Sequence, residues 1–142
     1  MMNSSLDAPA TTQVAALCHR NGTRGVEVLL ITSSSGRWIL PKGWPEAGLS
    51  DAEAAQQEAW EEAGIKDGVM RKEPFARFIT EKRFDNGAVV PCAIDVFTIA
   101  ATHVSDVYPE AHKRERRWMS IPKAVKLVDD PALRNVLKAF AA

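Results

Sequence analysis

Residues 43–65 read GWPEAGLSDAEAAQQEAWEEAGI, and this stretch carries the strongest local signals in the chain. Ser50, followed three residues later by Glu53, forms the pattern of a capping box, which marks the start of a helix. Gly64 suits the left-handed position that follows the last helical turn. The stretch therefore predicts a glycine-containing loop and then a helix that begins after Ser50 and ends at Gly64.

Three glutamates lie on one face of this expected helix. At about 100° per residue, Glu58, Glu61 and Glu62 fall within an arc of roughly 100°. Small side chains run beside them and let the helix approach a sheet closely, so the acids border the buried face. Like charges and partial burial raise carboxylate pKa values, and a divalent cation relieves both effects. The alternative is a solvated Glu-rich helix face, the commoner reason for such a run. The small residues are Ala52, Ala55, Ala59 and Ala63.

Runs of β-branched and aliphatic residues predict strands on both sides of the helix. Asp85-Asn86-Gly87 is a strong hairpin signal between two of them. Pro122 and Pro131 stand where proline is typical of a first helical turn. This order of elements predicts an α+β fold in which helices pack on both faces of a mixed, curved sheet. The expected strands are 12–20, 26–32, 75–84, 88–101 and 116–121, and the expected C-terminal helices are 123–128 and 132–140.

The composition is that of an ordinary globular domain, with 46% hydrophobic and 25% charged side chains in 142 residues. This length suits one domain with one core, which we place at 12–142. Residues 1–11 are polar and lack the basic start and apolar core of a secretory signal, so we expect a frayed lead-in. The formal net charge of +0 argues against a nucleic-acid partner bound through bulk charge. No apolar run approaches the ~20 residues that span a bilayer, so we expect no membrane association.

The two cysteines, Cys18 and Cys92, lie within strand-like runs and have neither CxxC nor Cys/His spacing. We therefore expect both to be reduced core residues in a cytoplasmic protein. A disulfide is the alternative if their strands are neighbours. The oligomeric state has no signal in the sequence.

The 43–65 stretch resembles the signature of the Nudix hydrolase family. That signature is a glycine, five residues, a glutamate, seven residues, and then Arg-Glu-hydrophobic-x-Glu-Glu-x-Gly-hydrophobic. Gly43, Glu58, Ala59, Glu61, Glu62, Gly64 and Ile65 fall in register with it. A pattern this long is far more specific than a lone glycine-rich loop. The flanking segments AALCHR, VEVLLITSSSGRWILPKG and RERRWMSIPKAVKLV resemble the diphosphoinositol polyphosphate and diadenosine polyphosphate branch of the family, from about Thr12 onward.

The resemblance implies an α/β/α sandwich that uses Mg²⁺ or Mn²⁺ to hydrolyse a phosphoanhydride bond. Carried over by position, Glu58 and Glu62 are the expected metal ligands. Glu61 is expected to be a further ligand or to hold a metal-bound water, and the Gly43 carbonyl to complete the coordination. The catalytic base varies in location within the family, and Glu58 and Glu61 are the two candidates here.

Two signature positions differ in this chain, because Leu49 replaces the first glutamate and Gln57 replaces the arginine. Gln57 precedes Glu61 by four residues, so an arginine there would pair with it along the helix. Losing both charges of an ion pair together is less destabilising than losing one, which would leave the other charge without a partner. We therefore expect that the metal ligands are retained while the residues that support them have lost their charge, and that activity is lowered. The rival interpretation is a domain that binds nucleotides or phosphates without efficient turnover.

Three basic residues are the expected substrate contacts. Lys42, in the turn before Gly43, is typical of dinucleoside polyphosphate hydrolases of this family; the alternative is an exposed turn lysine. Arg37 resembles a phosphate contact of the inositol branch. Arg116 is the best placed member of a basic cluster that also includes Lys113, Arg114 and Arg117. Glu110, in the loop before the last strand, is a weaker candidate for an additional acid.

The function that the resemblance implies is metal-dependent hydrolysis of a small polyphosphorylated or nucleoside-diphosphate-linked substrate. A dinucleoside polyphosphate or an inositol pyrophosphate is the leading expectation. Two alternatives stay open, namely pyrophosphohydrolysis of an oxidised nucleoside triphosphate and a catalytically weakened phosphate-binding domain.

Overall fold

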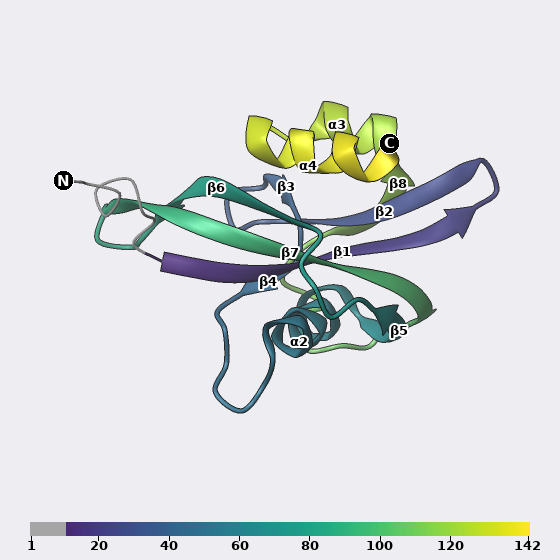
Figure 1. Ribbon diagram of the computed structural model, residues 1–142, viewed down its shortest axis with the longest axis horizontal. Coiled ribbons are helices and arrows are strands. Elements are labelled where there is room, and N and C mark those ends of the chain that lie inside the picture. Colours follow the sequence, from purple (N-terminus) through teal and green to yellow (C-terminus); the bar gives the residue numbers. More distant parts are fainter. Residues whose placement is uncertain (1–10) are drawn as a thin grey trace.

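Eight strands form one sheet in residues 11–142, the part of the chain that the computed structural model describes (Figure 1). The expected lead-in over 1–11 lies outside the described residues except for Thr11, where the first strand begins. The strands are β1 (Thr11–Gly22), β2 (Gly25–Thr32), β3 (Trp38–Ile39), β4 (Lys42–Gly43), β5 (Ile65–Met70), β6 (Ala76–Arg83), β7 (Val89–Val104) and β8 (Arg116–Ser120).

The sheet is mixed, as the sequence predicts. Its main path runs β3-β2-β1-β7-β5, while β4, β6 and β8 pair with β1, β7 and β2. β1 and β7 run parallel, from Thr11 opposite Cys92 to His19 opposite Ala100. Every other described pair is antiparallel. The long β7 therefore pairs with β1 along one edge, and along its other edge with β6 near its start and with β5 near its end.

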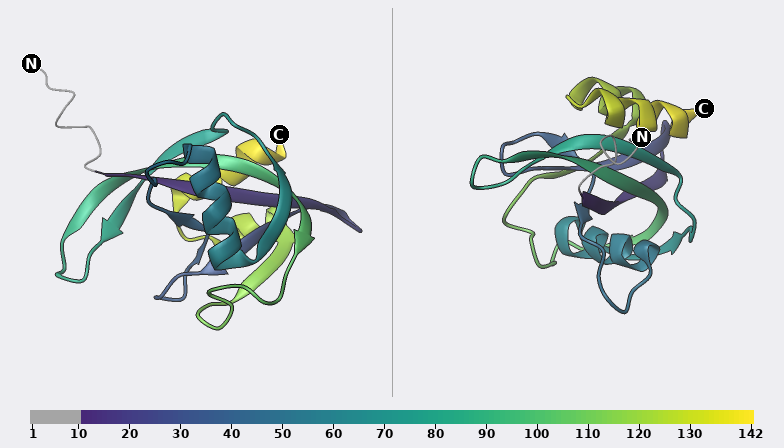
Figure 2. Two further views of the ribbon diagram at one scale, coloured as in Figure 1. Left: turned by 90° about the horizontal axis from the view of Figure 1, so that it is seen from below. Right: turned by 60° about the vertical axis from the view of Figure 1, so that its left-hand side comes forward.

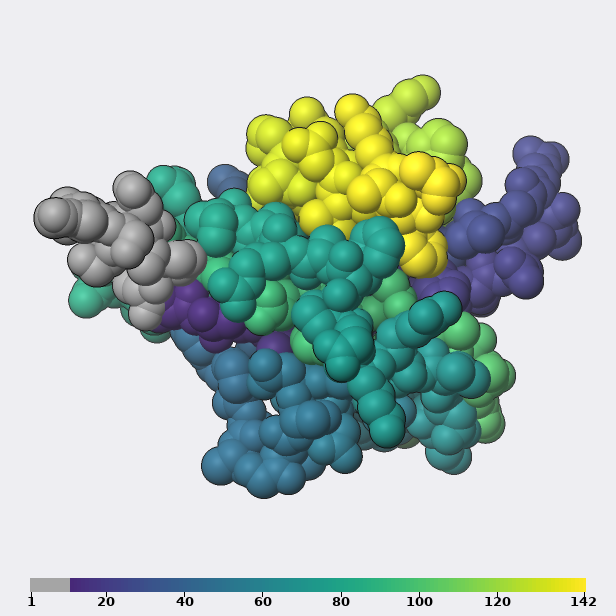
Figure 3. Space-filling view, in the orientation of Figure 1, coloured from purple at the N-terminus to yellow at the C-terminus, as the bar shows by residue number. Residues whose placement is uncertain are grey.

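Helices cover both faces of this sheet, which confirms the predicted α/β/α sandwich. Helix α2 (Asp51–Ala63) lies on one face, and α3 (Ile121–Leu127) and α4 (Pro131–Ala141) lie on the other (Figures 1 and 2). In the space-filling view the C-terminal helices and the loop before α2 stand on opposite sides of the molecule (Figure 3). Among residues 11–142, no helix has both the length and the apolar character that crossing a membrane requires.

Alternation along β1 divides the core into two layers. Val14, Ala16 and Cys18 are buried with α2, while Ala15 and Leu17 are buried with α3 and α4. A one-residue shift of this strand would exchange the two layers, so the alternation fixes its register.

Helix α2 has the boundaries that its sequence predicts. The Ser50 hydroxyl accepts the Glu53 amide and the Glu53 carboxylate accepts the Ser50 amide, so the capping box is formed. Gly64 ends the helix in the left-handed conformation, with φ of 73°. The alanine stripe is fully or almost fully buried against the sheet: Ala52, Ala55, Ala59 and Ala63. The border position of the three glutamates follows from this packing.

The predicted hairpin at 85–87 is confirmed, but β5 was not predicted. β5 has the sequence IKDGVM, which has neither a clean apolar run nor regular alternation. It is held instead by antiparallel pairing with β7, including register shifts around Asp67. Tertiary pairing of this kind overrides weak local propensity.

Both cysteines are buried and unpaired, as expected. Cys18 belongs to the core layer under α2 and Cys92 to the layer under the C-terminal helices. Since they lie on opposite faces of the sheet, the disulfide alternative is excluded. Burial raises the pKa of the Cys18 thiol to about 12, so this residue is chemically inert.

Candidate active site

Glu58 lies directly against the backbone of Gly43, where β4 meets α2. A Cβ added at Gly43 would overlap the carboxyl group of Glu58. The site therefore exists in this form only because residue 43 has no side chain. Gly43 itself is in extended backbone, paired with Val14 of β1, so close approach and not a left-handed conformation explains the glycine.

Glu62 lies one helical turn further along α2 and is buried, with 9% of the residue exposed. Its Oε1 atom accepts the backbone N–H of Lys42 at 3.1 Å. Strand β4 thus contacts both acids, since Gly43 faces Glu58 and Lys42 holds Glu62.

The two carboxyl groups are electrostatically unfavourable in the protein without a cation. Burial, followed by the charges of Glu62 and Glu61, raises the pKa of Glu58 to about 8. Burial also raises the pKa of Glu62, although the Lys42 amide and Arg114 oppose that rise. The raised pKa values indicate that the nearby cations do not offset the burial and mutual repulsion of these carboxylates.

The loop before β8 brings Glu110 to the same site. The Glu110 amide donates to the Glu61 carbonyl at 2.9 Å, which fastens this loop to α2. The Glu110 carboxylate accepts a hydrogen bond from Arg114 at 2.8 Å, and the same guanidinium lies 3.9 Å from Glu62 Oε1. Sequence reasoning named Arg114 only as one member of a basic cluster, and its position between two acids has no local sequence signal.

Glu61 keeps a partner despite the change at the signature arginine. The Gln57 side-chain amide donates to Glu61 Oε2 at 2.9 Å. Glutamine therefore preserves the four-residue contact along the helix but removes its charge. Leu49, at the other altered position, is half-buried in the loop before α2.

The chemistry of these groups fits a hard divalent cation. Glu58, Glu62 and Glu110 supply carboxylate oxygens, and β4 supplies backbone carbonyls beside them, which are the donors that Mg²⁺ and Mn²⁺ prefer. Within residues 11–142, no three His, Cys, Asp or Glu side chains are already arranged around a common point that could hold an ion. Two structural observations favour a bound divalent cation here. Glu58 lies so close to Gly43 that an added Cβ would overlap its carboxyl group, and the pKa of Glu58 is raised.

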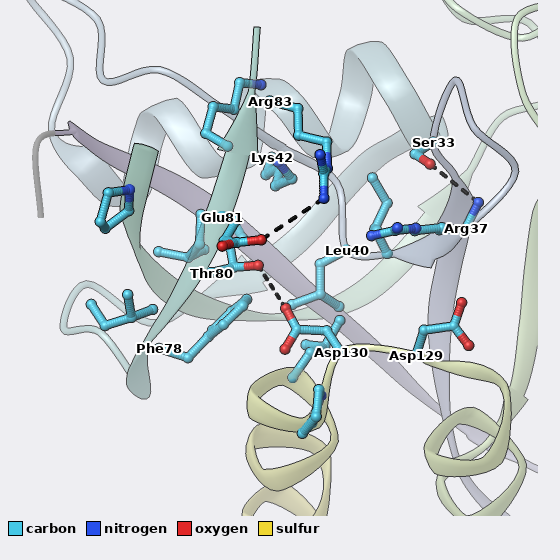
Figure 4. A pocket seen from close by; sticks show the side chains of 18 of the residues that line it. Ser33, Arg37, Leu40, Lys42, Phe78, Thr80, Glu81, Arg83, Asp129 and Asp130 are labelled. Carbon is cyan, nitrogen blue, oxygen red and sulfur yellow. Dashed lines mark hydrogen bonds and ion pairs between the residues drawn. The ribbon is translucent and has the colours of Figure 1, made fainter. Parts of the chain in front are cut away.

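A cavity of about 800 Å³ opens on the α4 side of the sheet (Figure 4). Among the described residues its lining includes Lys42 but none of the acids Glu58, Glu61, Glu62 and Glu110. Lys42 connects the two regions, because its amide binds Glu62 while its ammonium group binds Gln13 Oε1 at 3.2 Å and lines the cavity. Burial, with the nearby charge of Lys82, lowers the pKa of Lys42. The structure thus overturns the alternative of an exposed turn lysine.

Arg37 also lines this cavity, and Figure 4 shows its side chain directed across the opening. Lys82 and Arg83 reach the same opening from β6. Sequence reasoning missed both, because only the pairing of β6 with β7 brings them there. The remaining lining is mixed, with an apolar part that includes Leu40, Phe78, Ile94 and Leu133 and with three acids, Glu81, Asp129 and Asp130.

Arg116 does not reach the cavity. Its guanidinium donates to the carbonyls of Ala63 and Ser105 at 2.9 and 2.6 Å and to Asp106 at 2.6 Å. It therefore holds the C-terminal end of α2, where carbonyl groups lack helical partners and cations are favourable. Of the basic cluster at 113–117, the structure brings Arg114 to the acids and leaves Arg116 outside.

Residues 10–140 match the profile of the NUDIX domain. The chain belongs to the Nudix family. Nudix hydrolase 13, mitochondrial, of Arabidopsis thaliana is 30% identical over 123 residues, which cover 81% of this chain and 59% of that protein. Diphosphoinositol polyphosphate phosphohydrolase 3-beta of Bos taurus is 28% identical over 120 residues, covering 82% of this chain and 68% of that protein. This Nudix chain spans 55% to 59% of the length of three of its plant relatives.

The fold is also that of solved Nudix structures. The binary complex of the C. elegans Ap4A hydrolase superposes with a TM-score of 0.74 and 20% identity, covering 93% of this chain and 96% of that one. Similarity at this level of identity supports the fold alone.

The raised pKa of Glu58 predicts how the metal-free Nudix domain responds to pH. The pKa of Glu58 is about 8 in the folded protein and close to the ordinary value of 4.5 in the unfolded chain. The folded state therefore holds a proton that the unfolded state releases between these values, so stability falls as pH rises across this window and levels off above it. Thermal unfolding in EDTA from pH 5 to 9 measures this, and Glu58→Gln should show a flatter profile. Parallel profiles for the two proteins would contradict the assignment.

Proposed function

We propose that this Nudix chain is a pyrophosphohydrolase that cleaves a phosphoanhydride bond with the help of Mg²⁺ or Mn²⁺. The observation that carries the proposal is the placement of Glu58 against Gly43 and of Glu62 on the Lys42 amide. The same lysine lines the adjoining cavity, so an acid cluster and a cationic opening share one residue.

Glu58, Glu62 and the Gly43 carbonyl are the proposed metal ligands, with Glu61 as a further ligand or as the holder of a bound water. When bound, the cation lowers the pKa of water and neutralises charge on the bridging and leaving oxygens. Glu58 and Glu61 are the candidates for the base. Glu61 Oε2 is engaged by Gln57, which orients the carboxylate while Oε1 remains for a proton.

The cavity supplies the proposed substrate contacts. Lys42 and Arg37 would orient the phosphates, with Lys82 and Arg83 adding positive charge at the opening. The apolar part, which includes Phe78, suits a flat ring system.

The acidic part of the cavity favours a nucleotide over an inositol pyrophosphate. Asp129 is exposed and lines the cavity, and a carboxylate there would repel a ring that carries phosphates around its edge. The same carboxylate can accept hydrogen bonds from the amino group of a nucleobase. We therefore propose a dinucleoside polyphosphate as the leading substrate, with an inositol pyrophosphate second.

Product release from a set of substrates tests this function. Diadenosine polyphosphates, inositol pyrophosphates, oxidised and ordinary nucleoside triphosphates and sugar nucleotides are incubated with Mg²⁺ or Mn²⁺, and with EDTA as the control. Metal-dependent release of a nucleotide from a diadenosine polyphosphate is the expected result. Preferential turnover of an oxidised nucleoside triphosphate would replace the proposed substrate. Binding without turnover of any compound would favour the phosphate-binding domain.

A further inference from the structure

The positively charged guanidinium of Arg114 lies between two acids of the site, Glu110 and Glu62. Its Nη2 atom binds Glu110 at 2.8 Å, and its Nη1 atom lies 3.9 Å from Glu62 and 3.5 Å from the Thr32 carbonyl. Only 20% of its side chain is exposed. The guanidinium therefore supplies charge between carboxylates that would otherwise repel each other.

The backbone around Arg114 is fixed, although its side chain is incompletely bonded. The neighbouring Glu115 exchanges hydrogen bonds with Thr32, at 2.9 Å through the Thr32 hydroxyl and at 3.1 Å through the Thr32 amide. By contrast, the Arg114 Nε–H group is buried without a partner. A distance of 3.9 Å to Glu62 also exceeds that of a hydrogen bond. A guanidinium placed only for stability would satisfy its buried donors, because an unpaired one is costly.

We propose that Arg114 is an internal countercharge that competes with the divalent cation for Glu62 and Glu110. This inference rests on the proposed function, because it takes Glu62 as a metal ligand and adds Glu110 as a further acid beside the cation. In the metal-free protein the positive charge of the guanidinium stabilises the ionised acids. When a divalent cation is bound, the same charge repels that cation. Arg114 thereby lowers the metal affinity of the free domain. By linkage, an anionic ligand that draws the guanidinium away raises that affinity, so metal and anion bind cooperatively.

Mn²⁺ binding without substrate tests the competition. Dissociation constants are measured by calorimetry for the wild type, Arg114→Gln and Arg114→Lys, with thermal unfolding in EDTA and in Mn²⁺. Arg117→Gln is the matched control, since it removes the same charge from an exposed side chain of β8 that lies over the Trp38 ring.

Arg114→Gln is expected to bind Mn²⁺ about tenfold more tightly than the wild type, while its melting temperature in EDTA falls and recovers with Mn²⁺. Arg114→Lys and Arg117→Gln should remain near the wild-type affinity. An Arg114→Gln protein that folds only with Mn²⁺ supports the same conclusion. Equal or weaker Mn²⁺ affinity, or unfolding that Mn²⁺ does not reverse, would overturn the inference and leave the proposed function standing. Absence of Mn²⁺ binding by the wild type would overturn both.

Discussion

Replacing Glu62 by glutamine is expected to lower metal-dependent turnover by more than about 100-fold, because loss of a group that only supports a metal ligand already costs 10–100-fold. Glutamine has nearly the same shape and keeps an oxygen that can accept the Lys42 amide, a bond of 3.1 Å in the wild type. It removes the negative charge that attracts the cation. The turnover number with Mg²⁺ on the leading substrate is the measurement.

The stability of this variant separates a site defect from a folding defect. Because Glu62 raises the pKa of Glu58 through its charge, its removal relieves a repulsion in the metal-free protein. We therefore expect the melting temperature in EDTA to be unchanged or higher. Glu73→Gln, at an exposed acid between β5 and β6, is the control for the charge change and should keep full turnover. Turnover of Glu62→Gln equal to that of the wild type would remove Glu62 from the metal ligands.

Gly43→Ala is expected to reduce turnover by about 10- to 100-fold while leaving the fold intact. The added methyl group would overlap the Glu58 carboxyl. Since that carboxyl is the end of a flexible side chain, it can move away at little cost in stability, but it then leaves the position that we assign to a metal ligand. The residue is in extended backbone, so alanine introduces no conformational strain there. Steady-state kinetics with Mg²⁺ and a thermal melt together measure the effect.

The chain offers a closely matched control for this substitution. At Gly22 an added Cβ would also meet a glutamate side chain, that of Glu27, at 2.6 Å from its Cδ. Gly22→Ala should therefore displace a carboxylate in the same way, far from α2, and keep wild-type turnover. If the two alanine variants lose activity equally, the contact between Gly43 and Glu58 has no special role.

Local signals account for the parts of the fold that were predicted correctly. Ser50, Glu53 and Gly64 specify the ends of α2 through contacts within a few residues, and the turn at 85–87 specifies the hairpin in the same way. Strand β5 was missed because it is stabilised by pairing with β7 residues that lie 29 to 39 positions further along the chain.

In the candidate site, too, the residues grouped by local sequence were predicted and those brought together by tertiary contacts were not. Glu58, Glu61 and Glu62 share a helix face, so helical geometry alone groups them. The basic residues come from distant segments, and spacing could not tell which of Arg114 and Arg116 faces the acids. The structure shows that Arg114 does, whereas Arg116 is bound to the end of α2. The contributions of Lys82, Arg83 and Asp129 to the cavity depend on strand pairing and on the packing of α4.

The location of a bound metal tests the central claim most directly. Crystals of the domain grown with Mn²⁺ would give an anomalous difference peak wherever the ion is ordered. We predict a peak in contact with Glu58 and Glu62 and beside the Gly43 carbonyl, with the Arg114 guanidinium moved away from Glu62. A well-occupied peak at another site, or no peak while Glu58 still lies against Gly43, would contradict the account.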